Sequence, residues 1–485
     1  MRPWAVLIFC ASLFMGCANT ALVRYEKIAK KAGSQNYLDA AGMIRKHADA
    51  LYGSRSDLLY NMDLGLLYHY AGRYDSSTIF LGRAADKYDA LYTRSISNEA
   101  ASLVVNDNTR PYRSRPYEMM WLRVIQAFNY LALGRPDDAR VEMRQGQILL
   151  DALHGTAGKG SNAYREDPLY RGTAALVYDL LGERDDAAIS VYFAVKAHRD
   201  DHTAVPPMIG RLACRLLRAA DRRDDIRLLE LDCPSTLSGK RAVDSAEAAT
   251  ASTETGDVVV VGMLGRSPAI GETSFQGTWI RDGLLVYSYR DANTGKVVTD
   301  ALPAPGLPVS ESKKAGQGGR TRSGTTLSLK WAMPALREVP TQSRVLKVAG
   351  PAVVTGEAWG DTHDLLERDL AENWNSVLVR TVIRVGLRTL ATEKAKSEMR
   401  TDNPLLNLIT NVGVDFLSGQ LEQADARSWF LLPRTVQFAR LTLPVGRQTL
   451  QIGAENESGG TVLAETREIE VRAGQTSFVF FNSLK

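Results

Sequence analysis

Between about residues 21 and 231 the apolar side chains recur at helical spacing, and short turns built on glycine interrupt them. Three such turns centre on Gly72, Gly134 and Gly182, and an acidic residue follows each glycine within three or four positions. Glycine often ends a helix because it adopts positive φ without strain, and an acidic residue favours the first turn of the next helix. The pattern predicts a series of helical hairpins, with an earlier copy of the turn at residues 35–41.

The turns at Gly134 and Gly182 read Gly-x-x-Asp-x-Ala, a phrasing that resembles tetratricopeptide (TPR) repeats. The resemblance covers roughly residues 25–230. Successive turn glycines lie 62 and 48 residues apart, whereas TPR units repeat every ~34 residues. We therefore expect an all-α, degenerate TPR-like solenoid with long inserted loops over residues 17–233. A plain helical bundle would bury the same faces and is the alternative.

The periodicity changes in the second half of the chain. Residues 234–256 are rich in Ser, Ala, Thr and Glu without apolar periodicity, which predicts a solvated linker. Beyond it, strands are expected at 257–264, 279–289, 326–332 and 343–348, with a long loop at 303–324 and helices at about 362–399 and 404–420. This predicts an α+β domain over 257–430. The linker suggests that residues 17–233 and 257–485 fold separately.

The last segment alternates between apolar and polar residues. Four such runs, at 435–443, 447–452, 462–471 and 476–481, are separated by turns at Pro444-Val445-Gly446 and Ala473-Gly474. Alternation with period two is typical of half-buried strands. It predicts a small antiparallel β-sandwich over residues 431–485, so that the expected fold class is a multidomain protein with a TPR-like helical half and an α+β half.

The first 16 residues predict a secretory signal peptide. Arg2 precedes a short apolar run, too short to span a bilayer, that ends Leu13-Phe14-Met15-Gly16-Cys17. This ending resembles the lipobox of bacterial lipoproteins, although Phe14 and Met15 are bulkier than the preferred residues. We expect Cys17 to carry the lipid anchor, and the absence of Asp after it resembles lipoproteins sorted to the outer membrane. An ordinary signal peptide with an incidental cysteine is the alternative.

Two cysteines remain downstream of Cys17, at Cys214 and Cys233. Two thiols in an oxidising compartment suggest one disulfide. A second interpretation treats Cys214, on the apolar face of a predicted helix, as a small buried hydrophobic residue. The sequence leaves both interpretations open, because it does not place the two Cα atoms.

No recognised catalytic or cofactor motif is present. The chain lacks a Gly-x-Ser-x-Gly elbow, a His-Glu-x-x-His pair and a Cys-x-x-Cys pair. His198 and His202 have i,i+4 spacing that would suit a metal, but they fall at a predicted helix end, where cationic side chains suit the helix dipole. With 59 Lys+Arg against 55 Asp+Glu, the charge gives no argument for nucleic acid as a partner. We expect no metal, no cofactor and no enzyme activity.

Two clusters of cationic residues suggest partner binding. One is a proline-stiffened stretch with Arg110, Tyr112, Arg113, Arg115 and Tyr117. Arg and Tyr dominate interface hot spots, and three arginines so close together are expected to be mostly exposed. A connecting loop whose tyrosines pack on the helices is the alternative.

The second cluster lies on the long predicted helix at 362–399. Arg380, Arg384 and Arg388 recur every four residues and would form one cationic stripe. Such a stripe could meet lipid phosphates or an acidic partner. A charged row opposite an apolar face is also the ordinary solvated side of a helix, so both interpretations stay open.

Three segments together resemble a family of uncharacterised Gram-negative outer-membrane lipoproteins with a helical-repeat N-terminal half and a β-rich C-terminal half. They are residues 112–118, residues 127–142 and the Glu-Gln-Ala-Asp-Ala-Arg-Ser-Trp-Phe-Leu-Leu-Pro run at 422–433, in which Ala426 replaces an expected Thr. The resemblance implies location and architecture, and it brings no catalytic residues.

The favoured hypothesis is a scaffold that a lipid holds at the outer membrane, facing the periplasm, and that grips an envelope protein partner through its helical repeats. Such a scaffold would act in cell-wall or envelope assembly. An enzyme acting on peptidoglycan or another polysaccharide through carboxylates that no motif identifies is one alternative. A structural subunit of a surface or secretion assembly is the other.

Overall fold

The computed structural model describes residues 17–95, 110–156, 166–234, 254–280, 284–290, 295–303, 327–398 and 424–485. Helices make up its N-terminal half. They are α2 (Cys17–Gly33), α3 (Tyr37–Lys46), α4 (Ala48–Leu51), α5 (Asp57–Tyr70), α6 (Tyr74–Ser95), α7 (Pro116–Ala132), α8 (Pro136–Thr156), α9 (Pro168–Leu181), α10 (Arg184–Asp200), α11 (Pro207–Ala219) and α12 (Arg223–Leu228). None of the described helices is both long and apolar enough to cross a bilayer.

The predicted helical hairpins are present. α5 pairs with α6, α7 with α8 and α9 with α10, and each hairpin then packs on the next along the chain. Gly72, Gly134 and Gly182 occupy the three turns with φ of 69°, 69° and 75°, the left-handed conformation that glycine adopts without steric cost. Proline opens α7, α8 and α9, where its missing N–H leaves no hydrogen bond unmade.

Strands dominate the second half, and its described residues form three four-stranded sheets. The strands are β1 (Thr255–Leu264), β2 (Ala269–Ile280), β3 (Leu284–Arg290), β4 (Val297–Pro303), β5 (Leu327–Arg337), β6 (Val345–Ala349), β7 (Val353–Thr355), β8 (Glu357–Asp361), β9 (Thr435–Pro444), β10 (Gly446–Glu455), β11 (Thr461–Val471) and β12 (Thr476–Ser483). The sheet orders are β12-β1-β9-β8, β11-β10-β6-β7 and β4-β3-β2-β5.

The prediction of a single strand over 279–289 is wrong, because two antiparallel strands, β2 and β3, divide this region between them. The sequence held the signal for this division. Asp282-Gly283 is a strong hairpin dipeptide, and it lies between two runs of β-branched and aromatic residues. The strands β4, β7 and β8 were also not predicted.

The terminal segment does not form a β-sandwich of its own. β9 and β12 lie in a sheet completed by β1 and β8, while β10 and β11 lie in a sheet completed by β6 and β7. The pairing of β12 with β1 is parallel, so the first of these sheets is mixed rather than antiparallel. Pairing with strands from 255–361 satisfies backbone groups that four strands alone would leave at open edges.

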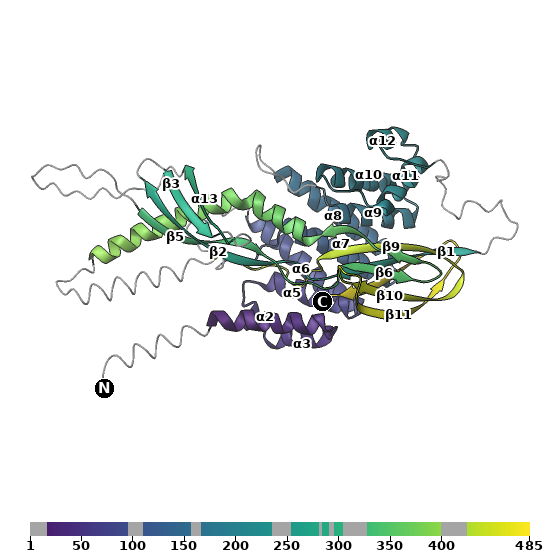
Figure 1. Cartoon of the computed structure of the whole chain (residues 1–485), viewed down its shortest axis with the longest axis horizontal. Coiled ribbons are helices and arrows are strands. Elements are labelled where there is room, and N and C mark those ends of the chain that lie inside the picture. The colour runs from purple at the N-terminus through teal and green to yellow at the C-terminus, as the bar shows by residue number, and fades with distance from the viewer. Residues whose placement is uncertain are drawn as a thin grey trace, which may run out of the picture.

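The third sheet and α13 (Thr362–Glu398) form an arm that extends away from the other two sheets (Figure 1). α13 packs on this sheet around a separate apolar cluster that includes Phe275, Trp331 and Leu378. The helix predicted at 362–399 is thus confirmed over the described residues. The helix predicted at 404–420 lies outside them.

One hydrophobic core joins the helical half to the β half. Its members include Phe128 of α7, Trp359 of β8, Phe438 of β9 and Phe480 of β12. The rings of Trp359 and Phe438 stack with centroids 3.9 Å apart, and Phe128 lies 5.5 Å from Phe480. β1 is buried on both faces, because Val259 and Val261 belong to this core while its alternate residues line the interior between two sheets.

This shared core bears on the expectation that the two halves fold separately. Residues 235–253 of the predicted linker lie outside the described part of the chain, so the boundary itself stays a prediction. Large aromatic side chains from both halves nevertheless cover each other, and separating the halves would return them to water. We therefore expect one cooperative unfolding transition, contrary to the expectation from the linker.

Gly172 of α9 provides a test of the contact between α9 and β8. A Cβ placed there would lie 2.7 Å from the buried indole of Trp359. Overpacking costs about 1–3 kcal/mol, and the helix propensity of alanine returns about 1 kcal/mol. Gly172→Ala should therefore lower the melting temperature by a few degrees. Gly42→Ala is the matched control, because no atom lies within 4 Å of its Cβ position; it should melt unchanged or later. A Gly172→Ala variant as stable as the parent would contradict this close packing.

Candidate functional site

The stretch from Arg110 to Tyr117 leads into α7, and its tyrosines point inward. Tyr112 and Tyr117 are each 2% exposed, so neither phenol is available to a partner. Arg113 is exposed, whereas the Arg115 side chain is 20% exposed and forms an ion pair with Asp369 of α13. The expectation that these arginines are mostly exposed is wrong for Arg115, because α13 brings a carboxylate to it.

Glu118, which the sequence analysis did not single out, is the centre of this region. Its carboxylate is fully buried and accepts hydrogen bonds from the Tyr112 hydroxyl at 2.5 Å, the Ser114 hydroxyl at 3.1 Å and the Arg115 backbone N–H at 2.9 Å. Its other oxygen accepts from the backbone N–H of Trp429 at 2.8 Å. Burial raises the pKa of Glu118, against the Arg115 charge and these hydrogen bonds.

The segment around Arg427 closes over the same stretch. Arg427 donates to the Asp425 carboxylate at 2.6 and 2.8 Å and to the backbone carbonyl of Arg110 at 3.1 Å. Its guanidinium also lies 5.5 Å from the centre of the Tyr112 ring. Two of the segments that carry the family resemblance, 112–118 and 422–433, thus meet through residues some 300 positions apart. Within the described residues their role is to join the two halves.

The arginines on α13 do not form one solvated stripe. Arg380 is exposed and donates to the Ser376 carbonyl at 3.1 Å, but Arg384 is only 4% exposed. The side chain of Arg388 lies outside the described residues. The burial of Arg384 therefore contradicts a stripe that is exposed along its whole length.

His198, Cys214 and Cys233 contact other residues of the helical half. His198 is 6% exposed, and its Nδ1 lies 3.0 Å from the Thr203 hydroxyl beyond the end of α10. No group of three His, Cys, Asp or Glu residues suited to a metal occurs in the described part of the chain. Cys214 and Cys233 form a disulfide with Cα atoms 5.5 Å apart, which ties the segment after α12 to α11.

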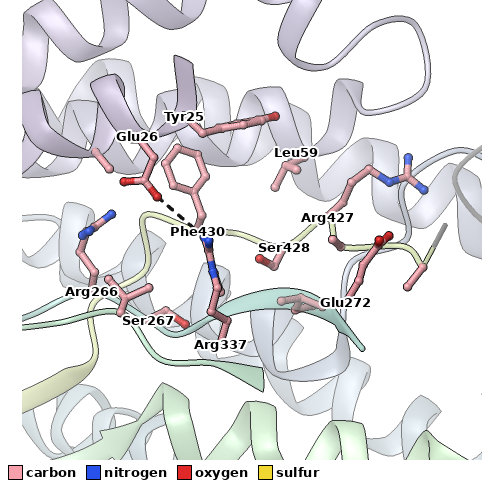
Figure 2. A pocket seen from close by; sticks show the side chains of 16 residues that line it. Tyr25, Glu26, Leu59, Arg266, Ser267, Glu272, Arg337, Arg427, Ser428 and Phe430 are labelled. Carbon is pink, nitrogen blue, oxygen red and sulfur yellow. Dashed lines mark ion pairs between the residues drawn. The ribbon is translucent and has the colours of Figure 1, made fainter. Parts of the chain in front are cut away.

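A cavity of about 390 Å³ lies beneath α2, where three distant parts of the chain converge (Figure 2). α2 and α5 form one wall, the β1–β2 connection with the start of β2 and the end of β5 form another, and residues 424–430 contribute the rest of the lining. The cavity has both apolar and charged walls. Its lining residues are Tyr25, Glu26, Ala29, Leu59, Arg266, Ser267, Ala269, Ile270, Glu272, Arg337, Val339, Ala424, Ala426, Arg427, Ser428 and Phe430.

The charges in this cavity are unevenly compensated. Arg337 lies 3.8 Å from Glu26, a loose ion pair. Arg266 makes no hydrogen bond or ion pair to any residue that the structure describes, and burial lowers its pKa, with Glu26 opposing and Arg337 reinforcing the shift. Glu272, toward the other end of the cavity (Figure 2), has its pKa raised by burial although the Ala424 backbone N–H donates to it. Sequence reasoning missed these residues because no local pattern connects them.

A smaller groove of about 160 Å³ lies on the helical half between α6, α7 and α8. Its apolar lining includes Met119, Leu149 and Ile148, and the last of these is 60% exposed. Arg123 also lines the groove, but its guanidinium pairs with Glu142 at 3.0 Å. The groove therefore offers mainly apolar contact, with little uncompensated charge.

No protein-family model matches this chain. No curated protein matches it either. The resemblance to envelope lipoproteins, the lipid anchor at Cys17 and the outer-membrane location therefore stay proposals.

Proposed function

We propose that this protein is a lipid-anchored scaffold of the bacterial envelope that binds a partner protein through its helical repeats. The anchor would be Cys17, at the outer membrane, with the folded chain facing the periplasm. The consecutive hairpins from α5 to α10 support a TPR-like array, a class of fold that presents extended surfaces to other proteins.

The β half determines which face of the array a partner can reach. The first helices of the hairpins, α5, α7 and α9, are buried along most of their length, and the chain's own strands cover part of that surface. The second helices carry large apolar side chains that face solvent. These are Ile79 on α6, Val141 and Ile148 on α8, and Ile189 on α10, which are 41–60% exposed.

The groove beside Ile148 is the observation that carries the proposal. Exposed apolar side chains next to a groove often mark a site of protein interaction. A space of about 160 Å³ accommodates an apolar side chain rather than a whole small molecule. The partner that fits is an amphipathic helix that places one large apolar residue between α6 and α8, the helix-in-groove mode of recognition.

Site-specific crosslinking in intact cells tests this proposal. A photoreactive residue at Gln145, beside the groove, should give one discrete adduct, and Ile148→Lys in the same chain should reduce that adduct at least tenfold. A photoreactive residue at Val353 of β7, which is 70% exposed, is the matched control and should give no such adduct. Cys17→Ser should release the protein from the membrane fraction and weaken the adduct. Equal adducts at both positions, or an adduct insensitive to Ile148→Lys, would contradict binding at the groove.

A further inference from the structure

The cavity beneath α2 is separate from the groove on α6 and α8 and plays no part in the proposed partner binding. Its walls come from α2, α5, the strands β2 and β5 and the segment 424–430. The size of about 390 Å³ falls within the range of small-molecule sites, 300–1,000 Å³. A space of this size with both apolar and charged walls suits a ligand that has both characters.

One end of the cavity carries an excess of positive charge. Arg266 and Arg337 are near enough for each to affect the other, and among the described residues that line the cavity Glu26 is the carboxylate beside both (Figure 2). The Arg266 guanidinium is partly desolvated and has no hydrogen-bond partner in the described residues. A planar guanidinium recognises carboxylate and phosphate oxygens through two parallel hydrogen bonds. An anionic ligand would therefore supply the hydrogen-bond acceptor that Arg266 does not find in Glu26.

Much of the remaining lining is apolar, and Glu272 lies at the far end from the two arginines. Phe430 stands in the cavity with its ring 4.9 Å from that of Tyr25, and Leu59 and Ile270 are only 2% and 5% exposed. Arg427 adds little charge, because the Asp425 carboxylate holds its guanidinium with two hydrogen bonds. Beside the cationic end there is thus an apolar surface suited to hydrocarbon.

We propose that this cavity binds an amphiphile with one anionic headgroup, a carboxylate or a phosphate monoester, and one hydrocarbon chain. The headgroup pairs with Arg266 and Arg337, and the chain lies against Phe430, Leu59 and Ile270. A fatty acid and a lysophosphatidic acid share this chemistry.

Calorimetric titration with short amphiphiles below their micellar concentration tests the assignment. The exported chain is purified with Cys17→Ser so that no acyl chain of its own competes. Dodecanoate and dodecyl phosphate should bind at a one-to-one ratio. Dodecanol, which lacks the charge, and inorganic phosphate, which lacks the chain, should each bind at least tenfold more weakly. The anionic probe that binds more tightly shows whether the cavity prefers a carboxylate or a phosphate headgroup.

Three variants locate the binding. Arg266→Gln should weaken dodecyl phosphate at least tenfold, and Arg447→Gln, at an exposed position on β10, should leave it unchanged. Ala426→Trp, at an exposed position on the rim of the cavity, should weaken dodecyl phosphate binding by obstruction. Because it leaves both arginines in place, it provides the test if Arg266→Gln fails to fold. Dodecanol binding as tightly as dodecyl phosphate, inorganic phosphate alone binding as tightly, or an affinity unchanged in both cavity variants would overturn the proposal.

Discussion

Glu118→Ala should lower the free energy of unfolding by about 3–5 kcal/mol, the range for breaking a buried charged network. The carboxylate accepts hydrogen bonds from two hydroxyls and two backbone N–H groups. Alanine would leave these donors without an acceptor, and a buried unsatisfied donor costs about 1–3 kcal/mol. Glu118→Gln retains one side-chain oxygen as an acceptor for the hydroxyls of Tyr112 and Ser114. The free energy of unfolding should therefore fall less in this variant, by about 1–3 kcal/mol.

Urea denaturation followed by helical circular dichroism and by tryptophan fluorescence measures this effect. Because Glu118 joins α7 to the backbone of Trp429, both signals should shift together and keep a common midpoint. Glu457→Gln is the control, since this side chain is 80% exposed, and it should change stability by no more than about 0.5 kcal/mol. A Glu118→Ala protein as stable as the control would show that the carboxylate does not hold the halves together.

The sequence predicted those parts of the fold that local patterns encode. Gly72, Gly134 and Gly182 mark the helical hairpins because a positive φ strongly favours glycine. The run from Asp257 to Leu264 is a strand, and its buried valines are typical of a strand covered on both faces. α13 was also recognised, because its acidic first turn and its apolar spacing are local features.

What the sequence did not predict depends on contacts between distant segments. Alternation within 435–481 identified four strands, but no local signal shows that β1 inserts between β9 and β12. The arginine-rich stretch appeared exposed because its acidic neighbour in space, Asp369, follows some 250 residues later. The burial of Arg384 likewise does not follow from the four-residue spacing of the arginines.

The cavity is the clearest case of a site that sequence patterns do not reveal. Arg266 follows β1, Arg337 ends β5 and Phe430 precedes β9, and none of them belongs to a recognisable motif. Their proximity results from the shared core, which fixes α2 and α5 against the strands. The glycine at position 265, with φ of 66°, permits the turn that carries Arg266 toward the cavity.

Protonation of His69 should destabilise the folded protein as the pH falls from about 6.5 to about 4. His69 of α5 lies in the core with its ring 5.8 Å from that of Phe480 in β12, and burial lowers its pKa from 6.5 to about 4. Its Nδ1 lies 2.7 Å from the Asn129 side-chain oxygen, Asn129 donates to Ser77 at 2.9 Å, and Ser77 donates to the Gly65 carbonyl at 2.7 Å. This chain of hydrogen bonds holds a neutral imidazole.

The sign follows from proton binding. With a pKa of about 4 in the folded state and 6.5 in the unfolded state, His69 binds fewer protons when folded, so acid favours unfolding. Each unit of difference corresponds to about 1.4 kcal/mol. The contribution of His69 is therefore fully present above pH 6.5 and declines by about 3 kcal/mol toward pH 4. Burial lowers the pKa of His198 to about 4 as well, which acts in the same direction.

The buried carboxyls of Asp63 and Glu118 act oppositely, because burial raises the pKa of each and acid then favours their folded forms. The whole pH profile therefore combines opposing contributions, and the His69 contribution is isolated by comparing variants. Between pH 7.5 and pH 4.5 the urea midpoint of the parent should move further toward lower stability than that of His69→Gln. This comparison holds whatever stability the variant loses at neutral pH. His154→Gln, at an exposed position near the end of α8, should keep the full difference. If His69→Gln and His154→Gln show the same dependence on pH as the parent, protonation of His69 does not destabilise the fold.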